Sequence, residues 1–377
     1  MRIAVIGAGI GGLAVAVGLQ ADAHEVTVFE RQSSPSAIGA GLTLFGNAFD
    51  ALDVLGLGEA VRSISSGAIA SMRSGQQDPS GKWLLTVPQG SMTGLRSVHR
   101  VELHQTLLAH LAPGSLHFGA SALIAQDGSP RVSVDETMSD FDLVIVADGI
   151  RSRNRTLLGL DPGLHYAGYT AWRGVTNRPV DLRGEAGETW GHGQLFGIVP
   201  LPDDRVYWFG TLSTAPGITA ANEHEQVCRE FTGWHDPIQE CLQATDAQAV
   251  LRHDIYDLAK PVSSLTRGRT VLLGDAAHAM TPNLGQGAGQ ALEDAATLVL
   301  LLRGNGAKEV PGVLARYESL RQRRTSELMR RSRTAGRLAQ ASNPLAVGLR
   351  NTALRLMPGI IMGTLSQRMQ RWPRPGQ

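Results

Sequence analysis

Short apolar runs occur near the start, in the middle and in the last third of the chain, and each is followed by glycine or an acidic residue. The runs are Arg2–Ile6, Glu25–Phe29, Phe141–Ala147 and Val271–Leu273. Continuous apolar runs of this length are typical of strands buried on both faces of a parallel sheet. Ala/Leu-rich stretches at Leu13–Leu19 and Ala291–Leu302 predict helices packed against them. The pattern therefore predicts an α/β fold with a Rossmann-like domain.

The residue pattern of the chain changes from about Pro162 onward. β-rich, aromatic stretches predict an antiparallel sheet, and they are Tyr166–Val175, Glu188–Trp190, Gln194–Leu201, Arg205–Leu212 and Leu251–Tyr256. We expect a first domain at 1–161 with a small β-rich insertion at 67–99, and a β-rich domain at 162–266. The first domain then resumes at 267–340, including a long helix over Pro311–Ala339, and amphipathic helices follow at 341–377.

Composition limits the classes of protein that this chain can belong to. Of the 377 residues, 42% are hydrophobic, which excludes a disordered chain. The formal net charge of +1 excludes a strong overall positive potential that would attract nucleic acid. Two cysteines cannot form a disulfide framework, and we expect no metal site. No signal-peptide pattern or membrane-spanning run is present, so we expect a cytoplasmic monomer or homodimer without stable membrane insertion.

The glycine-rich turn after the first apolar run has the spacing of a dinucleotide-binding motif, Gly7-Ala8-Gly9-Ile10-Gly11-Gly12. Gly7 makes the tight turn, Gly9 lets the backbone approach a pyrophosphate, and Gly12 permits close packing of helix on strand. Glu30 ends the second strand, where a carboxylate binds a ribose hydroxyl and repels a 2′-phosphate. Arg31 meets a phosphate or is solvated, and the sequence leaves both interpretations open.

A second glycine-rich loop leads into a helix near residue 290. Gly274 and Asp275 close the strand, and Pro282, Gly285, Gly287 and Ala288 precede the helix. Such a loop presents backbone N–H groups to an anionic or electron-rich group. A third motif, Asp148-Gly149, ends an apolar strand midway.

In order and spacing, these three motifs resemble those of the single-component (group A) FAD-dependent monooxygenases of p-hydroxybenzoate hydroxylase type. The resemblance covers nearly the whole chain. It implies tightly but non-covalently bound FAD, with Gly41, Arg100 and Leu123 as further cofactor contacts beside the motif residues. The family's Pro before Asn47 is replaced by Gly46, and its frequent Asn by Gly289.

The resemblance also implies a reaction cycle. NADH or NADPH, bound transiently, reduces FAD, O2 adds at flavin C4a, and the hydroperoxide transfers one oxygen to an aromatic or heteroaromatic substrate. An epoxidase or N-hydroxylase of the same fold is the alternative enzyme, and a non-catalytic FAD-binding protein is the alternative of another class. A flavin halogenase is disfavoured, because its Trp-x-Trp-x-Ile-Pro motif is absent: Trp190 is followed by Gly191.

We expect the substrate pocket between the β-rich domain and the Gly285 loop. The candidate residues are Leu195, Phe196, Tyr207 and Phe209 for the pocket, and Tyr207 and His192 to deprotonate or orient a phenol. Flavin-dependent urate hydroxylases, a related subgroup, place an Arg five residues before the strand's Pro. Leu195 stands at that position before Pro200, which favours a more apolar substrate. Arg173 is the one nearby residue expected to hold a carboxylate.

The C-terminal part combines arginines and apolar residues. Eight arginines crowd the long helix, where a solvated helix face is favoured over a nucleic-acid or anionic-membrane patch. The amphipathic tail over Leu345–Arg371 packs back on the protein in the favoured interpretation. Interfacial membrane contact and a dimer seam are the alternatives.

Overall fold

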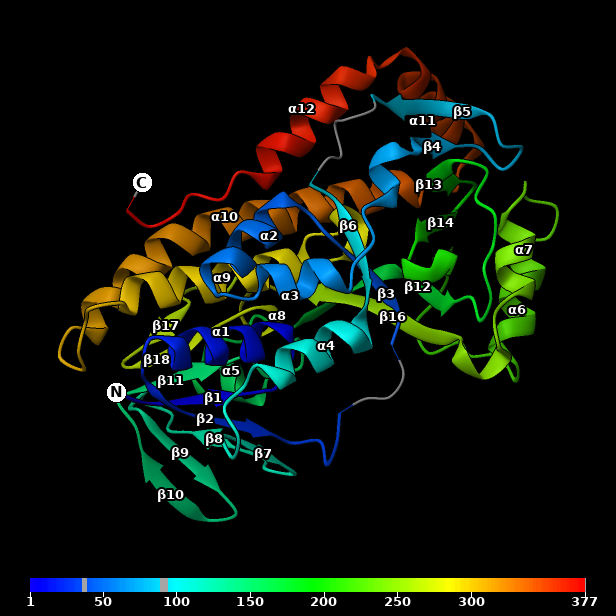
Figure 1. Cartoon of the computed structure of the whole chain (residues 1–377). Coiled ribbons are helices and arrows are strands. Elements are labelled where there is room, and N and C mark those ends of the chain that lie inside the picture. Colours follow the sequence, from blue (N-terminus) through cyan, green and yellow to red (C-terminus); the bar gives the residue numbers. More distant parts are fainter. Residues whose placement is uncertain (36–38, 89–93, 377) are drawn as a thin grey trace.

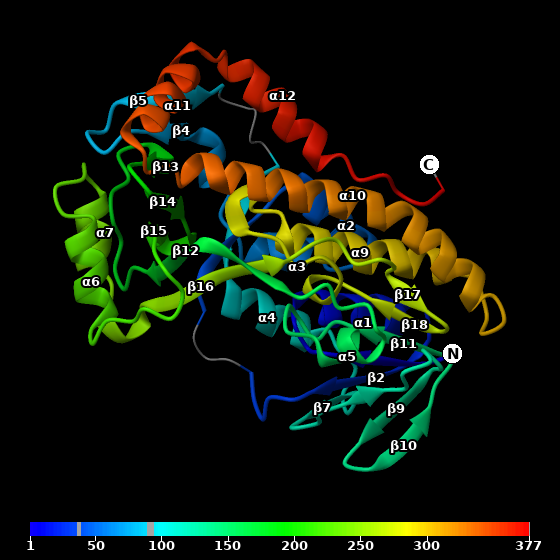
Figure 2. The same ribbon diagram turned by 180° about the vertical axis from the view of Figure 1, so that it is seen from behind.

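The computed structural model describes residues 1–35, 39–88 and 94–376. A parallel sheet with helices and an antiparallel sheet lie side by side, and the long helix α10 (Val310–Ala339) runs along both (Figures 1 and 2). The described chain therefore has the expected α/β architecture, with a β-rich part and a helical C-terminus.

The parallel sheet carries the first glycine motif at the carboxyl end of its central strand. Its order is β17-β18-β11-β1-β2-β7, and only β17 pairs antiparallel. The strands are β1 (Arg2–Ile6), β2 (Glu25–Glu30), β7 (Leu116–Phe118), β11 (Leu143–Val146), β17 (Thr266–Arg267) and β18 (Thr270–Leu272). The four buried strands predicted from the apolar runs are confirmed, with ends shifted by one or two residues.

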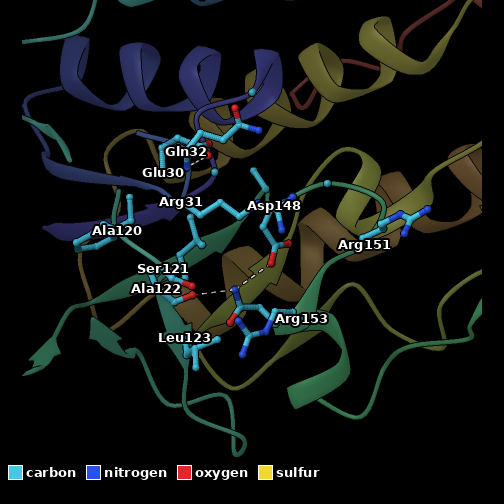
Figure 3. Close-up of a pocket in the computed structure, with 17 residues that line it drawn as sticks. Glu30, Arg31, Gln32, Ala120, Ser121, Ala122, Leu123, Asp148, Arg151 and Arg153 are labelled. Atoms are coloured by element: carbon cyan, nitrogen blue, oxygen red, sulfur yellow. Dashed lines mark hydrogen bonds between the residues drawn. The ribbon is translucent and has the colours of Figure 1, made fainter. Parts of the chain in front are cut away.

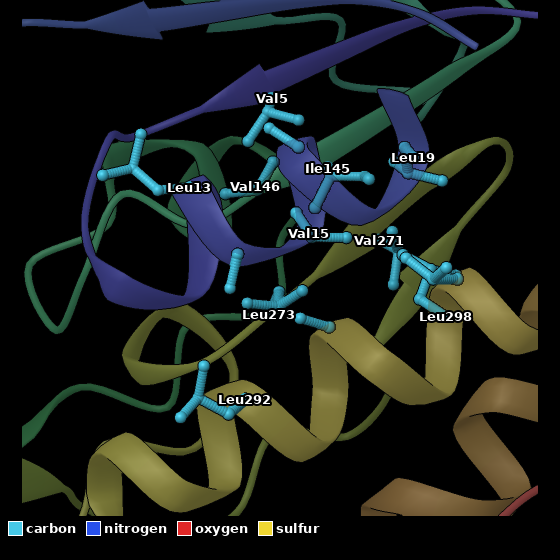
Figure 4. Packing of buried hydrophobic residues seen from close by; sticks show 14 of the residues in the cluster. Val5, Leu13, Val15, Leu19, Ile145, Val146, Val271, Leu273, Leu292 and Leu298 are labelled. Carbon is cyan, nitrogen blue, oxygen red and sulfur yellow. The ribbon is translucent and has the colours of Figure 1, made fainter. Parts of the chain in front are cut away.

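Two helices cover this sheet and form the largest core. α1 (Ile10–Ala21) packs on α9 (Gly287–Leu302), and between them Leu13 and Leu292 are fully buried. Figure 4 shows these side chains interleaved with Val5 and Ile145 of the sheet. Each buried aliphatic side chain contributes roughly 1.5–3 kcal/mol, so both glycine-rich loops rest on a rigid base.

The antiparallel sheet is larger than the sequence predicted. Its order is β16-β12-β15-β14-β13-β4-β5. The strands are β4 (Arg73–Gln77), β5 (Trp83–Val87), β12 (Leu164–Val175), β13 (Glu185–Trp190), β14 (Gln194–Pro200), β15 (Val206–Ser213) and β16 (Leu251–Leu258). Part of the predicted insertion at 67–99 joins this sheet, because β4 pairs in parallel with β13.

Shorter elements complete the fold. The strands are β3 (Gly41–Leu44), β6 (Arg96–His99), β8 (Leu123–Ile124), β9 (Arg131–Val134) and β10 (Thr137–Asp140). The α-helices are α2 (Gly46–Val54), α3 (Gly58–Ser63), α4 (Arg100–Ala109), α5 (Arg153–Leu157), α6 (Glu223–Glu230), α7 (Ile238–Gln243), α8 (Asp275–His278), α11 (Pro344–Leu356) and α12 (Gly359–Gln370). Short 3-10 turns lie at Ala68–Ser71, Pro202–Asp204, Ala247–Ala249 and Pro282–Leu284. None of the helices in the described ranges is long and apolar enough to cross a membrane.

The arginines of α10 confirm the predicted solvated helix face only in part. The exposed ones are Arg316, Arg323, Arg330, Arg331 and Arg337, whereas others turn inward. Arg321 is fully buried and pairs with Glu293 and with Asp294, whose Oδ1 lies 2.6 Å from Arg321 Nε. Arg324 Nη2 lies 2.6 Å from Glu293 Oε1. The prediction failed for these residues because the carboxylates that they meet belong to α9, which is distant from them in the sequence.

Candidate active site

A first cavity of about 210 Å³ opens at the carboxyl ends of β1 and β2. Figure 3 shows Glu30, Arg31, Leu123 and Asp148 around it, and Gly7 and Gly9 complete the predicted residues that line it. The Glu30 carboxylate accepts the N–H of Ala8 at 2.9 Å and that of Gln32 at 2.8 Å. These bonds fix the carboxylate beside the glycine turn, where the sequence predicted a ribose contact.

Two glycines of this turn have contrasting surroundings. A Cβ atom on Gly12 would lie 2.0 Å from the carbonyl oxygen of Gly7, so no larger residue fits there without displacing the turn. A Cβ on Gly9 would meet nothing within 4 Å, so the backbone at Gly9 faces open space. This combination suits a turn that approaches a bulky anionic ligand.

Asp148 carries an unsatisfied acceptor at the same cavity. Asn154 Nδ2 donates to Asp148 Oδ2 at 2.9 Å, whereas Asp148 Oδ1 is buried and has no partner among the residues that the structure describes. A buried acceptor without a donor is costly, and a ligand hydroxyl or N–H would satisfy it. The orphaned oxygen therefore fits a bound dinucleotide.

A second and larger cavity, of about 780 Å³, continues from the first. Both are lined by Gly9, Glu30, Gln32 and Arg151, so they join into one elongated cleft. The predicted residues Ile10, Arg100 and Pro282 line the second cavity, together with Arg173 and His253. An extended cleft with the glycine turn at its junction fits an extended cofactor such as FAD.

Arg173 and Arg100, which line this cavity beside His253, give it a positive character. Burial lowers the pKa of His253, and the charges of Arg173 and Arg100 lower it further. His253 is therefore neutral at neutral pH, and the two arginines supply the local charge.

The second glycine-rich loop lies at the N-terminus of α9. Gly285 has φ +62°, and a Cβ there would come within 3.1 Å of the Phe45 ring. Gly287 begins the helix, and it and Ala288 are half-buried, so their N–H groups lie at the positive end of the helix. This geometry suits the stabilisation of negative charge on a ring held against the loop.

Buried side chains hold this loop from behind. Asn47 Nδ2 donates to Gln286 Oε1 at 3.0 Å and to Glu293 Oε1 at 2.6 Å. A Cβ on Gly289 would lie 3.3 Å from Asn47 Nδ2, so Asn47 occupies space that a larger residue at 289 would need. The two sequence departures, Gly46 and Gly289, thus lie around one asparagine.

Gly274 and Asp275 differ in their surroundings. The N–H of Gly274 donates to Asp294 Oδ2 at 2.9 Å, and His278 Nε2 lies 2.6 Å from the same oxygen. Burial would raise the pKa of Asp294, but the charges of His278 and Arg321 outweigh it and lower the pKa to about 2. Asp294 is therefore a permanent anion that anchors the turn, whereas Asp275 is exposed at the first residue of α8.

One face of the antiparallel sheet points toward these loops. In antiparallel strands, directly paired residues lie on the same face. Leu251, Arg173, Phe209, Gly197 and Glu188 form one row of paired residues across β16, β12, β15, β14 and β13. Because Leu251 and Arg173 line the large cavity, Phe209 and Glu188 lie on the same face of the sheet.

Glu188 is the functional candidate that the sequence analysis missed. Burial raises the pKa of its carboxyl, and the bond that Trp190 Nε1 donates to Oε2 at 2.8 Å opposes this shift. Its side chain is half-buried on the face of the sheet that carries Phe209. The signal in the sequence was a second carboxylate, three residues after Glu185, in a strand that ends in an aromatic residue.

Tyr207 and Phe209 lie together on this face, as predicted. Their ring centroids are 5.8 Å apart, and a Cβ on Gly41 would come within 2.5 Å of Tyr207 Cβ. Gly41 therefore lets β3 approach the tyrosine closely. Burial raises the pKa of Tyr207, and the charges of Arg173 and Arg100 oppose the shift.

Of the other three predicted residues, two lie elsewhere. Phe196 points to the opposite face, where its ring centroid lies 5.5 Å from that of Trp208 and 5.0 Å from that of Phe231, so its assignment to the pocket is wrong. His192 is exposed in the turn between β13 and β14, away from the row of Glu188. Leu195 is on the inner face, packed in an apolar cluster with Trp190.

Known proteins resemble this chain over almost its full length. The family model of the FAD binding domain matches residues 1–332. Aurachin C monooxygenase/isomerase of Stigmatella aurantiaca is 34% identical over 95% of this chain and 94% of its own length. The 2-heptyl-3-hydroxy-4(1H)-quinolone synthase of Pseudomonas aeruginosa is 34% identical over 98% of this chain and 97% of its own. The crystal structure of Klebsiella pneumoniae HpxO complexed with FAD and uric acid matches with a TM-score of 0.88 at 27% identity, over 98% of this chain and 96% of that one.

Proposed function

Because the chain belongs to the single-component (group A) FAD-dependent monooxygenases, we propose that it hydroxylates an apolar heteroaromatic ring of the 2-alkyl-4(1H)-quinolone class. When bound, FAD would supply acceptance of two electrons from NADH or NADPH and activation of O2, with one oxygen atom entering the substrate and the other leaving as water. The protein's own residues bind and orient the ring, exclude water and move protons.

The carboxylate of Glu188 is the observation that carries this proposal. It is a carboxylate on a sheet face that also carries Phe209, Trp190 and Leu195. A quinolone offers an apolar bicyclic body with one ring N–H. Accepting that proton raises the electron density at the ring carbon next to the carbonyl, which is the carbon that receives oxygen in this proposal.

The surroundings of Leu195 argue against a polar substrate such as uric acid. Leu195 packs with Leu84, Trp190 and Ala339, which supply no charge or hydrogen-bond donor toward the ring. A polar purine trione would leave several of its own groups unpaired there, at a cost of about 1–3 kcal/mol for each. An alkyl-substituted ring has no such groups to satisfy.

The relatives support the same substrate class. One is named for aurachin C and the other for 2-heptyl-3-hydroxy-4(1H)-quinolone. Each is 34% identical to this chain.

For the cofactor, we propose that Gly7, Gly9, Glu30 and Asp148 hold the adenosine and pyrophosphate. In the same proposal Gly285, Gly287 and Ala288 hold the flavin ring. Tyr207 remains a candidate for orienting the substrate. The cytoplasmic location and the monomeric or homodimeric state remain predictions.

The test compares substrates with the purified, FAD-loaded enzyme. Oxidation of NADH and of NADPH is followed in air with 4(1H)-quinolones carrying a 2-methyl, 2-propyl or 2-heptyl chain, and with uric acid and salicylate. Each buried methylene contributes about 0.8 kcal/mol, so kcat/KM should rise about fourfold per added carbon until the chain leaves the pocket. A higher kcat/KM for uric acid or salicylate than for every quinolone would refute the assignment.

A further inference from the structure

Large exposed apolar side chains gather on the two C-terminal helices. Leu345 is 80% exposed, Leu349 74%, Leu356 78%, Ile360 68% and Ile361 46%. We propose that this face of α11 and α12, called the C-terminal face below, docks on the surface of an anionic lipid bilayer.

The spacing of these residues makes a continuous stripe on α11. Leu345, Leu349 and Leu356 stand at i, i+4 and i+11, positions that share one side of an α-helix. The opposite side carries Val347 and Leu354, which are buried against the protein. α11 thus has two apolar sides, and packing within the chain accounts for only one of them.

The charge of the same segment identifies the partner. Residues 341–377 contain five of the chain's 35 basic residues and none of its 34 acidic ones. Arg355 pairs with Asp78 and Arg374 with Asp50. Arg368 and Arg371 are exposed, and in the described part of the chain no ion pair is recorded for either. Apolar side chains flanked by unneutralised arginines are the pattern of helices that lie in the interface of an anionic membrane.

A second copy of the chain fits this face less well. A two-fold interface brings the same patch of both copies together, so the unneutralised arginines of each copy would face those of the other. Like charges at a shared interface repel, whereas anionic headgroups supply the missing negative charge.

The position of α11 gives the docking a consequence for substrate entry. Leu354 and Met357, on its inner side and at its end, join the apolar cluster that includes Leu195 and Phe209. Figure 1 shows α11 over β4 and β5 and α12 at the outer edge, above α10. A single layer of helix therefore separates the C-terminal face from the predicted substrate side, which suits a substrate that dissolves in lipid. The docking itself does not depend on the proposed substrate.

The test measures binding of the FAD-loaded enzyme to vesicles by flotation. Vesicles of phosphatidylcholine alone are compared with vesicles that also contain phosphatidylglycerol, at low and high salt. We expect binding that requires phosphatidylglycerol and weakens as salt rises. The triple variant Leu345→Gln/Leu349→Gln/Leu356→Gln should lower the partition coefficient by about 100-fold, since each exposed leucine contributes roughly fivefold.

Two further variants separate apolar and charge contributions. Arg368→Gln/Arg371→Gln should weaken binding to phosphatidylglycerol vesicles by about fivefold per arginine. Met138→Gln/Leu164→Gln/Ile218→Gln, exposed apolar residues elsewhere, should bind as the native chain does. Turnover of a water-soluble substrate and the circular dichroism spectrum should be unchanged in every variant.

Three results would overturn the proposal. One is absence of binding to either kind of vesicle, and another is an equal loss of binding in the control triple variant. The third is a dimer, seen by light scattering of the native chain, that dissociates in the leucine triple variant, which would assign the face to a second copy.

Discussion

Replacing Glu188 by glutamine keeps the size of the side chain but removes its charge. The variant can no longer take the proton of a substrate N–H, although its amide oxygen can still accept a hydrogen bond. A positioned general base contributes about 10²–10⁴-fold to rate. We therefore expect kcat/KM for the best quinolone to fall by at least about 100-fold. FAD content should be unchanged, because Glu188 belongs to β13 of the seven-stranded sheet and lines neither cavity of the cofactor cleft.

The pH dependence gives this prediction a sharper form. Burial raises the folded-state pKa of Glu188 above its ordinary value of 4.5. The activity of the native chain should therefore rise with pH on a limb centred above 4.5, and Glu188→Gln should lack that limb. Trp190→Phe removes the donor that opposes the shift, so it should move the limb to higher pH.

Glu188→Gln should lower the activity but should not lower the free energy of unfolding at alkaline pH. A carboxyl with a raised folded-state pKa binds its proton more tightly in the folded state than in the unfolded chain. Its contribution to the free energy of unfolding is thus present at low pH and is lost as pH rises through the folded-state pKa. At pH 8 the glutamine variant should be as stable as the native chain or more stable, and this advantage should disappear in acid.

Steady-state kinetics and thermal unfolding across pH measure both effects. Glu185→Gln, on the same strand but bonded to Gln77, is the matched control and should leave kcat/KM unchanged. If Glu188→Gln keeps full kcat/KM with an unaltered acidic limb, the carboxylate has no role in proton transfer. If it instead loses activity and stability together at pH 8, its role is structural.

Three further predictions concern the pocket, the glycine turn and the buried ion network. Leu195→Arg places an unpaired charge in an apolar cluster, so steady-state kinetics should show kcat/KM for 2-alkylquinolones about 100-fold lower. Unchanged kinetics would show that Leu195 does not line the pocket. Gly12→Ala puts a Cβ 2.0 Å from the Gly7 oxygen and should reduce the FAD retained after gel filtration by more than about tenfold. In the control Gly312→Ala the new Cβ meets nothing within 4 Å, and this variant should retain FAD fully. Arg321→Met leaves buried carboxylates unpaired and should cost about 3–5 kcal/mol, roughly 5 °C in Tm by calorimetry at pH 7. The pKa of Asp294 is lowered from 3.8 to about 2, so its ion pair with Arg321 stabilises the fold fully at any pH above 3.8. The difference in stability between the native chain and the variant should therefore shrink only as pH falls from about 4 toward 2. A difference that is already lost at about pH 6 would contradict this assignment.

The cofactor side of the site was predictable because its signals are local. The turn from Gly7 to Gly12, the strand end at Glu30 and the loop at Gly285 each need a residue type that backbone geometry or close approach dictates. The structure brings Gly7, Glu30 and Asp148 to one cavity.

The substrate side depended on information that a single sequence lacks. The strand that carries Leu195 and Phe196 has apolar residues on both faces, so alternation alone did not tell which face meets the cofactor loops. Glu188 became a candidate only once the pairing of β13 with β14 set its face. The burial of Arg321 likewise depends on the contact of α10 with α9, and the sequence around Arg321 does not predict that contact.

The most direct test of the proposed reaction is the mass of the product formed from 2-heptyl-4(1H)-quinolone under ¹⁸O2. We predict one hydroxylated product that carries a single ¹⁸O atom, formed in a one-to-one ratio to the NADH or NADPH consumed. NADH and NADPH oxidation that yields only hydrogen peroxide, with the quinolone recovered unchanged, would contradict the proposal.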